Sequence, residues 1–118
     1  MKVENNSLYR VSKLVSTAEG FRATVDWLSG HPVYHGHFPE RAVVPGVLTL
    51  ALVRSCAEAV IGHKVAYAGI KECKFLSTLL PDDEPTITLD FALDGNSQLS
   101  GTVRRGPDLV LKLKATLK

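Results

Sequence analysis

The spacing of apolar residues changes twice along this chain. Residues 8–18 and 21–28 are rich in β-forming residues, and in the second segment apolar and polar side chains alternate. The apolar set of that segment is Phe21, Ala23, Val25 and Trp27. Strict alternation predicts a half-buried strand with Trp27 packed on its buried face, and a turn at Glu19-Gly20 joins the two segments into a predicted hairpin.

Residues 47–61 form the one segment with a convincing helical pattern. Pro45 and Gly46 open it, and Gly62 follows it in the place of a C-terminal capping glycine. Its only polar residues are Thr49, Arg54, Ser55 and Glu58. We therefore expect a helix that is buried on most of its sides.

Alternation returns after the helix. Residues 64–79 predict one long strand, bulged at Gly69. Three more strands and two tight turns follow, over residues 87–93, 97–104 and 109–117 and at Asp94-Gly95 and Gly106-Pro107. The order of two strands, a long loop, one helix and four strands predicts an α+β fold in which a curved antiparallel sheet wraps around the helix.

Length and composition narrow the class of protein. The 118 residues predict a single domain over residues 1–118, and 45% apolar against 22% charged residues excludes disorder by composition. The N-terminus lacks the apolar core of a signal peptide, and the longest apolar stretch, residues 42–53, is far too short to span a membrane. Cys56 and Cys73 form no CxxC motif and are expected to be reduced, so the sequence predicts a cytoplasmic protein.

The net charge of +2 is too small to indicate a nucleic-acid partner. The cations nevertheless concentrate at one end, since residues 100–118 hold five Lys and Arg against one Asp. Such an excess attracts an acidic partner. Solvent-facing positions on C-terminal strands explain it more simply, and we favour that interpretation.

Segment 29–46 differs in composition from the strands around it. It holds three prolines, three glycines and three of the four histidines, so we expect a long functional loop. The histidines are His31, His35 and His37. No carboxylate or cysteine stands at a zinc-like offset from them, so a metal site is not favoured.

This loop leads into the start of the predicted helix, where the first backbone N–H groups have no acceptor within the helix. Gly46 lets a ligand approach these groups closely. A carbonyl oxygen held there would be polarised, and a neutral histidine nearby could remove a proton from the adjacent carbon. The residues therefore predict a carbonyl-polarising site with a histidine base and an apolar neighbour for the substrate.

Two motifs then point to a family. His35-Gly36-His37-Phe38-Pro39, followed by VVPGVL at residues 43–48, resembles the GHFP…PGV signature of the hot-dog-fold 3-hydroxyacyl-[acyl-carrier-protein] dehydratases of the FabZ and FabA type. Residues 68–75 and 80–83 are similar to a strand and turn motif of the same family. The resemblance implies a hot-dog fold, in which a curved antiparallel sheet wraps one long helix, and an acyl tunnel along that helix.

The resemblance also implies partners and a pathway. It implies a homodimer with two sites at the subunit interface, or a dimer-based hexamer, and it implies no cofactor. The substrates it implies are acyl thioesters on acyl-carrier protein or coenzyme A, in fatty acid or related lipid or polyketide biosynthesis.

By the same resemblance, His37 is the catalytic base and the Gly46 N–H binds the thioester carbonyl. The further residues expected to contact the substrate are Tyr34, His35, Phe38, Pro45, Val47 and Ala51. Family members carry a Glu or Asp on the helix, fourteen residues after the base, that assists departure of the hydroxyl group. This chain has Ala51 at that position, and alanine cannot donate a proton.

No other residue replaces the missing carboxylate by sequence position alone. Glu58 lies about 10 Å further along the helix axis, and Arg54 is always charged and a poor proton donor. Tyr34, His35 and His31 stand as candidate donors from the loop.

Three functions stay open. The favoured one is dehydration of 3-hydroxyacyl thioesters, or the reverse hydration. A thioesterase usually needs a carboxylate to activate water, which position 51 does not offer. A non-catalytic acyl-binding or carrier-protein-binding subunit, paired with an active homologue, is the third.

Overall fold

A computed structural model of the chain describes residues 3, 6, 8–28, 44, 46–77, 86–95 and 97–118. Its elements are β1 (Tyr9–Ser16), β2 (Phe21–Trp27), α1 (Gly46–Ile61), β3 (Tyr67–Phe75), β4 (Thr86–Asp94), β5 (Gln98–Arg105) and β6 (Asp108–Leu117). This order confirms the two strands, one helix and four strands that the spacing of apolar residues predicts.

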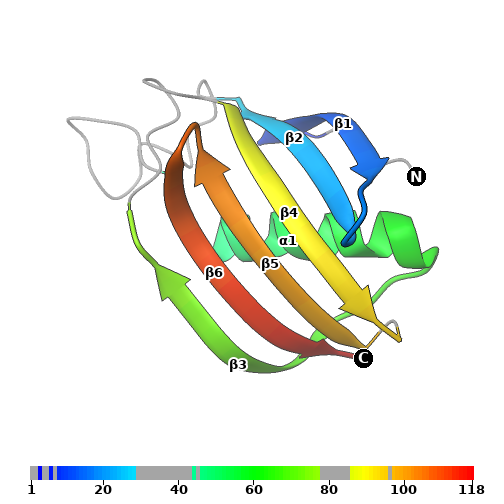
Figure 1. The fold of residues 1–118 in the computed structure, drawn as a ribbon. Coiled ribbons are helices and arrows are strands. Elements are labelled where there is room, and N and C mark those ends of the chain that lie inside the picture. The colour runs from blue at the N-terminus through cyan, green and yellow to red at the C-terminus, as the bar shows by residue number, and fades with distance from the viewer. Residues whose placement is uncertain are drawn as a thin grey trace.

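The six strands form one antiparallel sheet in the order β1-β2-β4-β5-β6-β3. Figure 1 shows α1 lying across the inner face of the curved sheet. After α1 the chain returns to the edge of the sheet opposite β1, where β3 pairs with β6. The sheet therefore wraps around the helix, as the sequence predicts, and its two outermost strands in the described part of the chain are β1 and β3.

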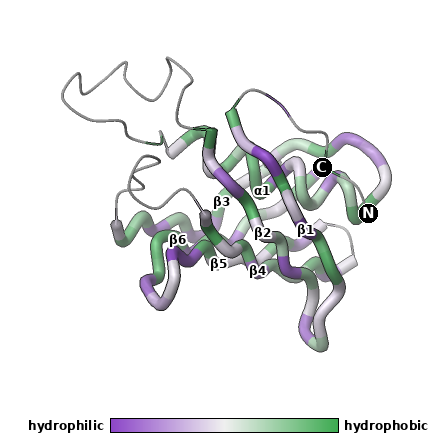
Figure 2. Tube along the Cα trace, turned by 90° about the horizontal axis from the view of Figure 1, so that it is seen from above, coloured by the Kyte–Doolittle hydropathy of each residue, from purple (hydrophilic) through white to green (hydrophobic). Residues whose placement is uncertain are grey.

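Alternate residues of the strands turn toward α1 and form the core, and Figure 2 shows the resulting alternation of hydrophobic and hydrophilic positions. The inward residues of the central strands include Ile87, Leu89, Phe91, Leu111 and Leu113, all buried. On β2, Trp27 is 2% exposed and its ring meets that of Tyr9 edge-on, with 5.9 Å between centroids. The predicted packing role of Trp27 is confirmed.

The helix differs from the expectation in one respect. Its buried residues are Thr49, Leu52, Val53, Cys56 and Ala57, which share the side that faces the sheet. The opposite side is a stripe of residues three and four apart, Val47, Ala51, Arg54 and Glu58, which we call the open stripe. Burial on most sides is therefore wrong for this chain by itself, because one sheet covers only one side of the helix.

β3 covers most of the strand that the sequence predicts over residues 64–79. Its pairing extends beyond its bounds, because Ala66 and Lys118 exchange backbone hydrogen bonds of 2.9 Å each and the Leu76 N–H donates to the Val110 carbonyl at 2.7 Å. The register with β6 shifts between Tyr67 and Gly69 and again further along. The bulge predicted at Gly69 is thus present beside that residue.

The helix ends at Gly62, whose φ of +94° lies in the left-handed region. The Gly62 N–H still donates to the Glu58 carbonyl, at 2.8 Å, and closes the last turn. A left-handed residue directly after a helix is the usual capping conformation, so the predicted role of Gly62 is confirmed.

Gly62→Ala is expected to lower the free energy of unfolding by about 1–2 kcal/mol, because a Cβ is strained at positive φ. The matched control is Gly69→Ala. A Cβ added to either glycine would have no atom within 4 Å. Of the two, only Gly62 has a positive φ. The control should change stability by less than about 0.5 kcal/mol. Urea unfolding followed by Trp27 fluorescence measures both, and equal losses would contradict the capping account.

Candidate active site

The start of α1 is a candidate place for a carbonyl oxygen to bind. The helix begins at Gly46 and has no acidic residue in its first turn. No carboxylate of that turn therefore neutralises the positive end of the helix dipole. Backbone N–H groups at this end have no acceptor within the helix, so they can donate to an oxygen on which negative charge develops.

Gly46 is also where β3 meets the helix start. A Cβ on Gly46 would lie only 3.0 Å from Cζ of Phe75, so glycine allows the Phe75 ring to lie against α1. Phe75 is nevertheless 48% exposed, and its chain neighbour Leu76 and the helical Val47 are 54% and 73% exposed. We call Val47, Phe75 and Leu76 the helix-start apolar cluster. Of these three, the Phe75 ring lies against the start of α1 and leaves apolar surface uncovered there.

Ala51 lies one turn into the helix, on the open stripe. The acidic residue of that stripe, Glu58, is already engaged, because its Oε2 accepts the Val65 N–H at 2.9 Å and lies 3.7 Å from Arg54 Nη1. These contacts tie Glu58 to the connection that follows the helix. The prediction that Glu58 cannot replace the family carboxylate is consistent with this geometry.

A hydroxyl that the sequence analysis did not single out lies beside Ala51. Tyr67 of β3 donates its phenolic proton to the Leu50 carbonyl at 2.6 Å. Burial raises the pKa of the Tyr67 hydroxyl to about 12, and the positive charge of Arg54 opposes part of this shift. A half-buried tyrosine usually finds a partner for its hydroxyl, but the strand pattern alone does not say which carbonyl it reaches.

Neither cysteine has the environment of a nucleophile. Both are free, and burial raises the pKa of the Cys56 thiol to about 12. Burial also raises the pKa of Cys73, which is only partly buried. Thiols with raised pKa values are poor nucleophiles, so neither thiol is poised to attack a substrate. Their expected reduced state stays a prediction.

The structure places three of the residues expected in the site on one helix, with Gly46 at its start and Val47 and Ala51 on its open stripe. The others lie outside the described residues: His37, Tyr34, His35, Phe38 and Pro45, together with His31. Their predicted roles stay predictions.

The described residues show neither a metal site nor a membrane-spanning helix. No group of three or more His, Cys, Asp or Glu side chains among them could hold a metal ion. In the same part of the chain, no helix is both long and apolar enough to cross a membrane.

Comparison with known proteins gives a consistent result. A family model described as ApeI-like, the ApeI dehydratase, matches residues 15–106. The 3-hydroxyacyl-[acyl-carrier-protein] dehydratases FabZ of Staphylococcus aureus strains JH9 and Newman are each 35% identical to the chain over 105 residues. The match covers 81% of this chain and 68% of each relative.

Two solved structures share the fold. The dehydratase heterocomplex ApeI:P from Xenorhabdus doucetiae matches with a TM-score of 0.77 at 19% identity, over 99% of this chain and 98% of the other. The dehydratase domain of RzxB from Pseudomonas fluorescens matches with a TM-score of 0.68 at 14% identity, over 91% of this chain and 43% of the other. These matches confirm the hot-dog fold that the motifs imply.

Tyr67→Phe removes the hydrogen bond to Leu50 and is expected to cost about 1 kcal/mol at neutral pH. The unfolded chain loses the Tyr67 proton near pH 10, whereas the folded chain holds it to about pH 12. The stability that wild type gains from this group should therefore fall as pH rises from about 10 to 12. Urea unfolding of wild type and Tyr67→Phe across this pH range measures the difference between their free energies of unfolding. Titrating groups that both proteins share cancel in that difference. A difference that stays constant or grows would contradict the assignment.

Proposed function

The chain belongs to the ApeI-like dehydratase family, and from this premise we propose that it is a subunit of a 3-hydroxyacyl-thioester dehydratase. Its FabZ relatives are named for 3-hydroxyacyl groups on acyl-carrier protein. We propose the same substrate class here, with acyl-carrier protein or coenzyme A as the carrier. The reverse hydration of 2-enoyl thioesters follows from the same chemistry.

The observation that carries the proposal is the start of α1. Gly46 begins a helix with no acidic residue in its first turn, beside the helix-start apolar cluster. The Gly46 N–H would donate to the thioester carbonyl, and His37 would take the proton from the adjacent carbon. The negative charge that develops on the carbonyl oxygen is stabilised by the N–H groups. The 3-hydroxyl group then leaves with a proton as water, and the 2,3 double bond forms.

The proton for the leaving hydroxyl group has no good source among the described residues near Ala51. Tyr67 already donates to Leu50, and a pKa of about 12 makes it a weak acid at neutral pH. Glu58 is held by Val65 and Arg54. We therefore propose that the acid comes from a second chain or from the loop that carries Tyr34 and His35.

The surface left open on α1 supports the second-chain source. Val47 of the open stripe is 73% exposed, and β3 is an outermost strand that presents Ile70 at 46% exposure. Exposed apolar side chains at the edge of a sheet are suited to a subunit interface. Two copies of this chain would each bring Ala51, whereas a different family member would bring a carboxylate. The similar ApeI:P protein is a heterocomplex, which favours a non-identical partner here.

His37→Ala is expected to remove the remaining activity. Without its own acid the wild-type chain should hydrate a short 2-enoyl thioester slowly, and loss of the base should lower that rate by about 10²–10⁴-fold. His63→Ala is the matched control, because His63 is exposed just beyond the helix, with its ring Nδ1 3.1 Å from the Lys64 carbonyl oxygen. Absorbance of the enoyl thioester follows the reaction. Equal rates for wild type and His37→Ala, or a wild-type rate at background, would contradict the proposal.

A further inference from the structure

Arg54 is a charged residue of the open stripe, on the side of α1 that the sheet leaves uncovered. Large apolar side chains are exposed on the same side of the molecule. Val47 of the stripe is 73% exposed, and Ile70 and Phe75 of β3 are 46% and 48% exposed. In the β3–β6 register, Ile70 and Phe75 lie opposite buried residues of β6, so both belong to the face of the sheet that carries α1.

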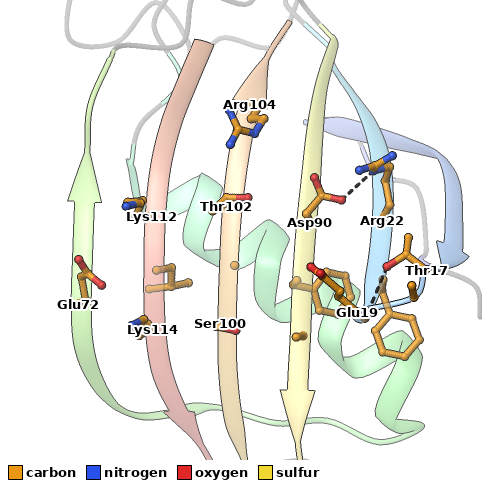
Figure 3. Close-up of a pocket in the computed structure, with 17 residues that line it drawn as sticks. Thr17, Glu19, Arg22, Glu72, Asp90, Ser100, Thr102, Arg104, Lys112 and Lys114 are labelled. Atoms are coloured by element: carbon orange, nitrogen blue, oxygen red, sulfur yellow. Dashed lines mark hydrogen bonds and ion pairs between the residues drawn. The ribbon is translucent and has the colours of Figure 1, made fainter. Parts of the chain in front are cut away.

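The outer face of the sheet has a different character. It carries a hollow of about 700 Å³, which Figure 3 shows with α1 behind the strands. The lining residues labelled there are all polar or charged, and two of them are paired, with 2.7 Å between Arg22 Nε and Asp90 Oδ1. A second chain that buries apolar surface therefore gains more on the α1 side.

The present contacts of Arg54 are weak. Its Nη1 lies 3.7 Å from Oε2 of Glu58, beyond hydrogen-bond distance, and the same oxygen already accepts the Val65 N–H at 2.9 Å. Arg54 makes no other ion pair within the described residues. A guanidinium group carries five N–H donors, so the capacity of Arg54 to bind an anion is largely unused in this part of the chain.

The charge of Arg54 reaches the turn of the helix that carries Ala51. It opposes part of the rise in the pKa of the Tyr67 hydroxyl, and this hydroxyl donates to the carbonyl of Leu50, next to Ala51. Arg54 is also three residues beyond Ala51 on the same stripe, a rise of about 4.5 Å. A carboxylate brought to the side chain of Ala51 would thus lie within reach of the guanidinium.

A partner that covers this side of α1 takes the charge of Arg54 out of water. A buried cation with no anion beside it strongly destabilises an interface. A guanidinium that is paired with a carboxylate is instead a common anchor of interfaces. A partner that fits this surface is therefore one that presents a carboxylate to Arg54.

Symmetry indicates where that carboxylate stands in the partner. Two like helices that pack about a perpendicular two-fold axis run antiparallel, and residue i of one then meets residue j of the other. The open stripe runs over positions 47, 51, 54 and 58, so its mid-point lies between 51 and 54. Pairing about this mid-point places Arg54 opposite position 51 of the second chain.

A second copy of this chain does not supply the anion. It brings Ala51 to that position, and its Glu58 is held by Val65 as in the first copy. Two guanidinium groups would then be covered without a carboxylate. A chain of the same fold with Asp or Glu at the position of Ala51 would give Arg54 an ion pair.

We propose that Arg54 selects the second subunit, by pairing with a carboxylate that a non-identical chain of the same fold carries opposite it. The proposal rests on the proposed function, in which a second chain completes the site. It adds the residue of this chain that distinguishes such a partner from a second copy.

The test is a double-mutant cycle on self-association, measured by sedimentation equilibrium of the purified chain. Ala51→Glu gives each copy a carboxylate opposite the Arg54 of the other, so the dissociation constant should fall by about tenfold or more. Ala51→Gln, the matched control of similar shape without charge, should leave it within about threefold of wild type. In an Arg54→Met background, Ala51→Glu should raise the dissociation constant, because its carboxylate is then buried without a cation.

Three results would overturn the proposal. The first is equal dissociation constants for Ala51→Glu and Ala51→Gln, and the second is a gain from Ala51→Glu that persists with Arg54→Met. The third is a wild type that associates as tightly as Ala51→Glu, because an identical copy would then suffice.

A pair formed within one helix is a distinct outcome, since positions 51 and 54 are three residues apart. It would raise the free energy of unfolding of the monomer and leave the dissociation constant unchanged, and it would also count against the proposal. Failure of the proposed function would show separately, as absent hydration of 2-enoyl thioesters, because association is measured without any activity.

Discussion

Burial of one side of α1 against the inner face of the sheet is the constraint on which the rest of the structure depends. Leu52, Val53 and Cys56 of the helix are fully buried there, and burial of a side chain such as Leu52 or Val53 stabilises the fold by about 1.5–3 kcal/mol. A single sheet covers one side of a helix only. The open stripe, with Ala51 and the exposed Val47, is the direct consequence of this packing. The same packing also brings the end of β3 to the start of the helix, where the Phe75 ring lies against Gly46.

The same packing affects the two halves of the proposed reaction differently. The positive end of α1 and the Gly46 N–H are products of the backbone, so they survive any substitution on the open stripe. The resemblance to the family implies an acid at position 51 on that stripe, where this chain has alanine. A hot-dog protein can therefore keep the carbonyl-polarising half of the reaction and lose the proton-donating half. Pairing with a different family member would restore the second half without any change in this chain.

Much of the fold follows from local sequence. The strict alternation of β2 and the glycine at 62 predict a strand and a helix end that the structure confirms. The hydrogen bond from Tyr67 to the Leu50 carbonyl and the engagement of Glu58 with Val65 were not predicted. Each of them joins segments whose approach depends on strand register and on the path of the chain after the helix. Periodicity gives the face of a residue, but it does not give the neighbour that the residue meets on that face.

The most direct measurement is the rate of 2-enoyl-thioester hydration by the purified chain with Ala51→Glu, compared with wild type and Ala51→Gln. If the missing acid is what limits this chain, glutamate should raise the rate by about 10²-fold or more, because it can transfer a proton. Glutamine has nearly the same shape and cannot transfer a proton, so it should leave the rate at the wild-type level. A glutamate variant no faster than wild type would contradict the account, since the carboxylate missing at position 51 would then not be what limits the reaction of this chain.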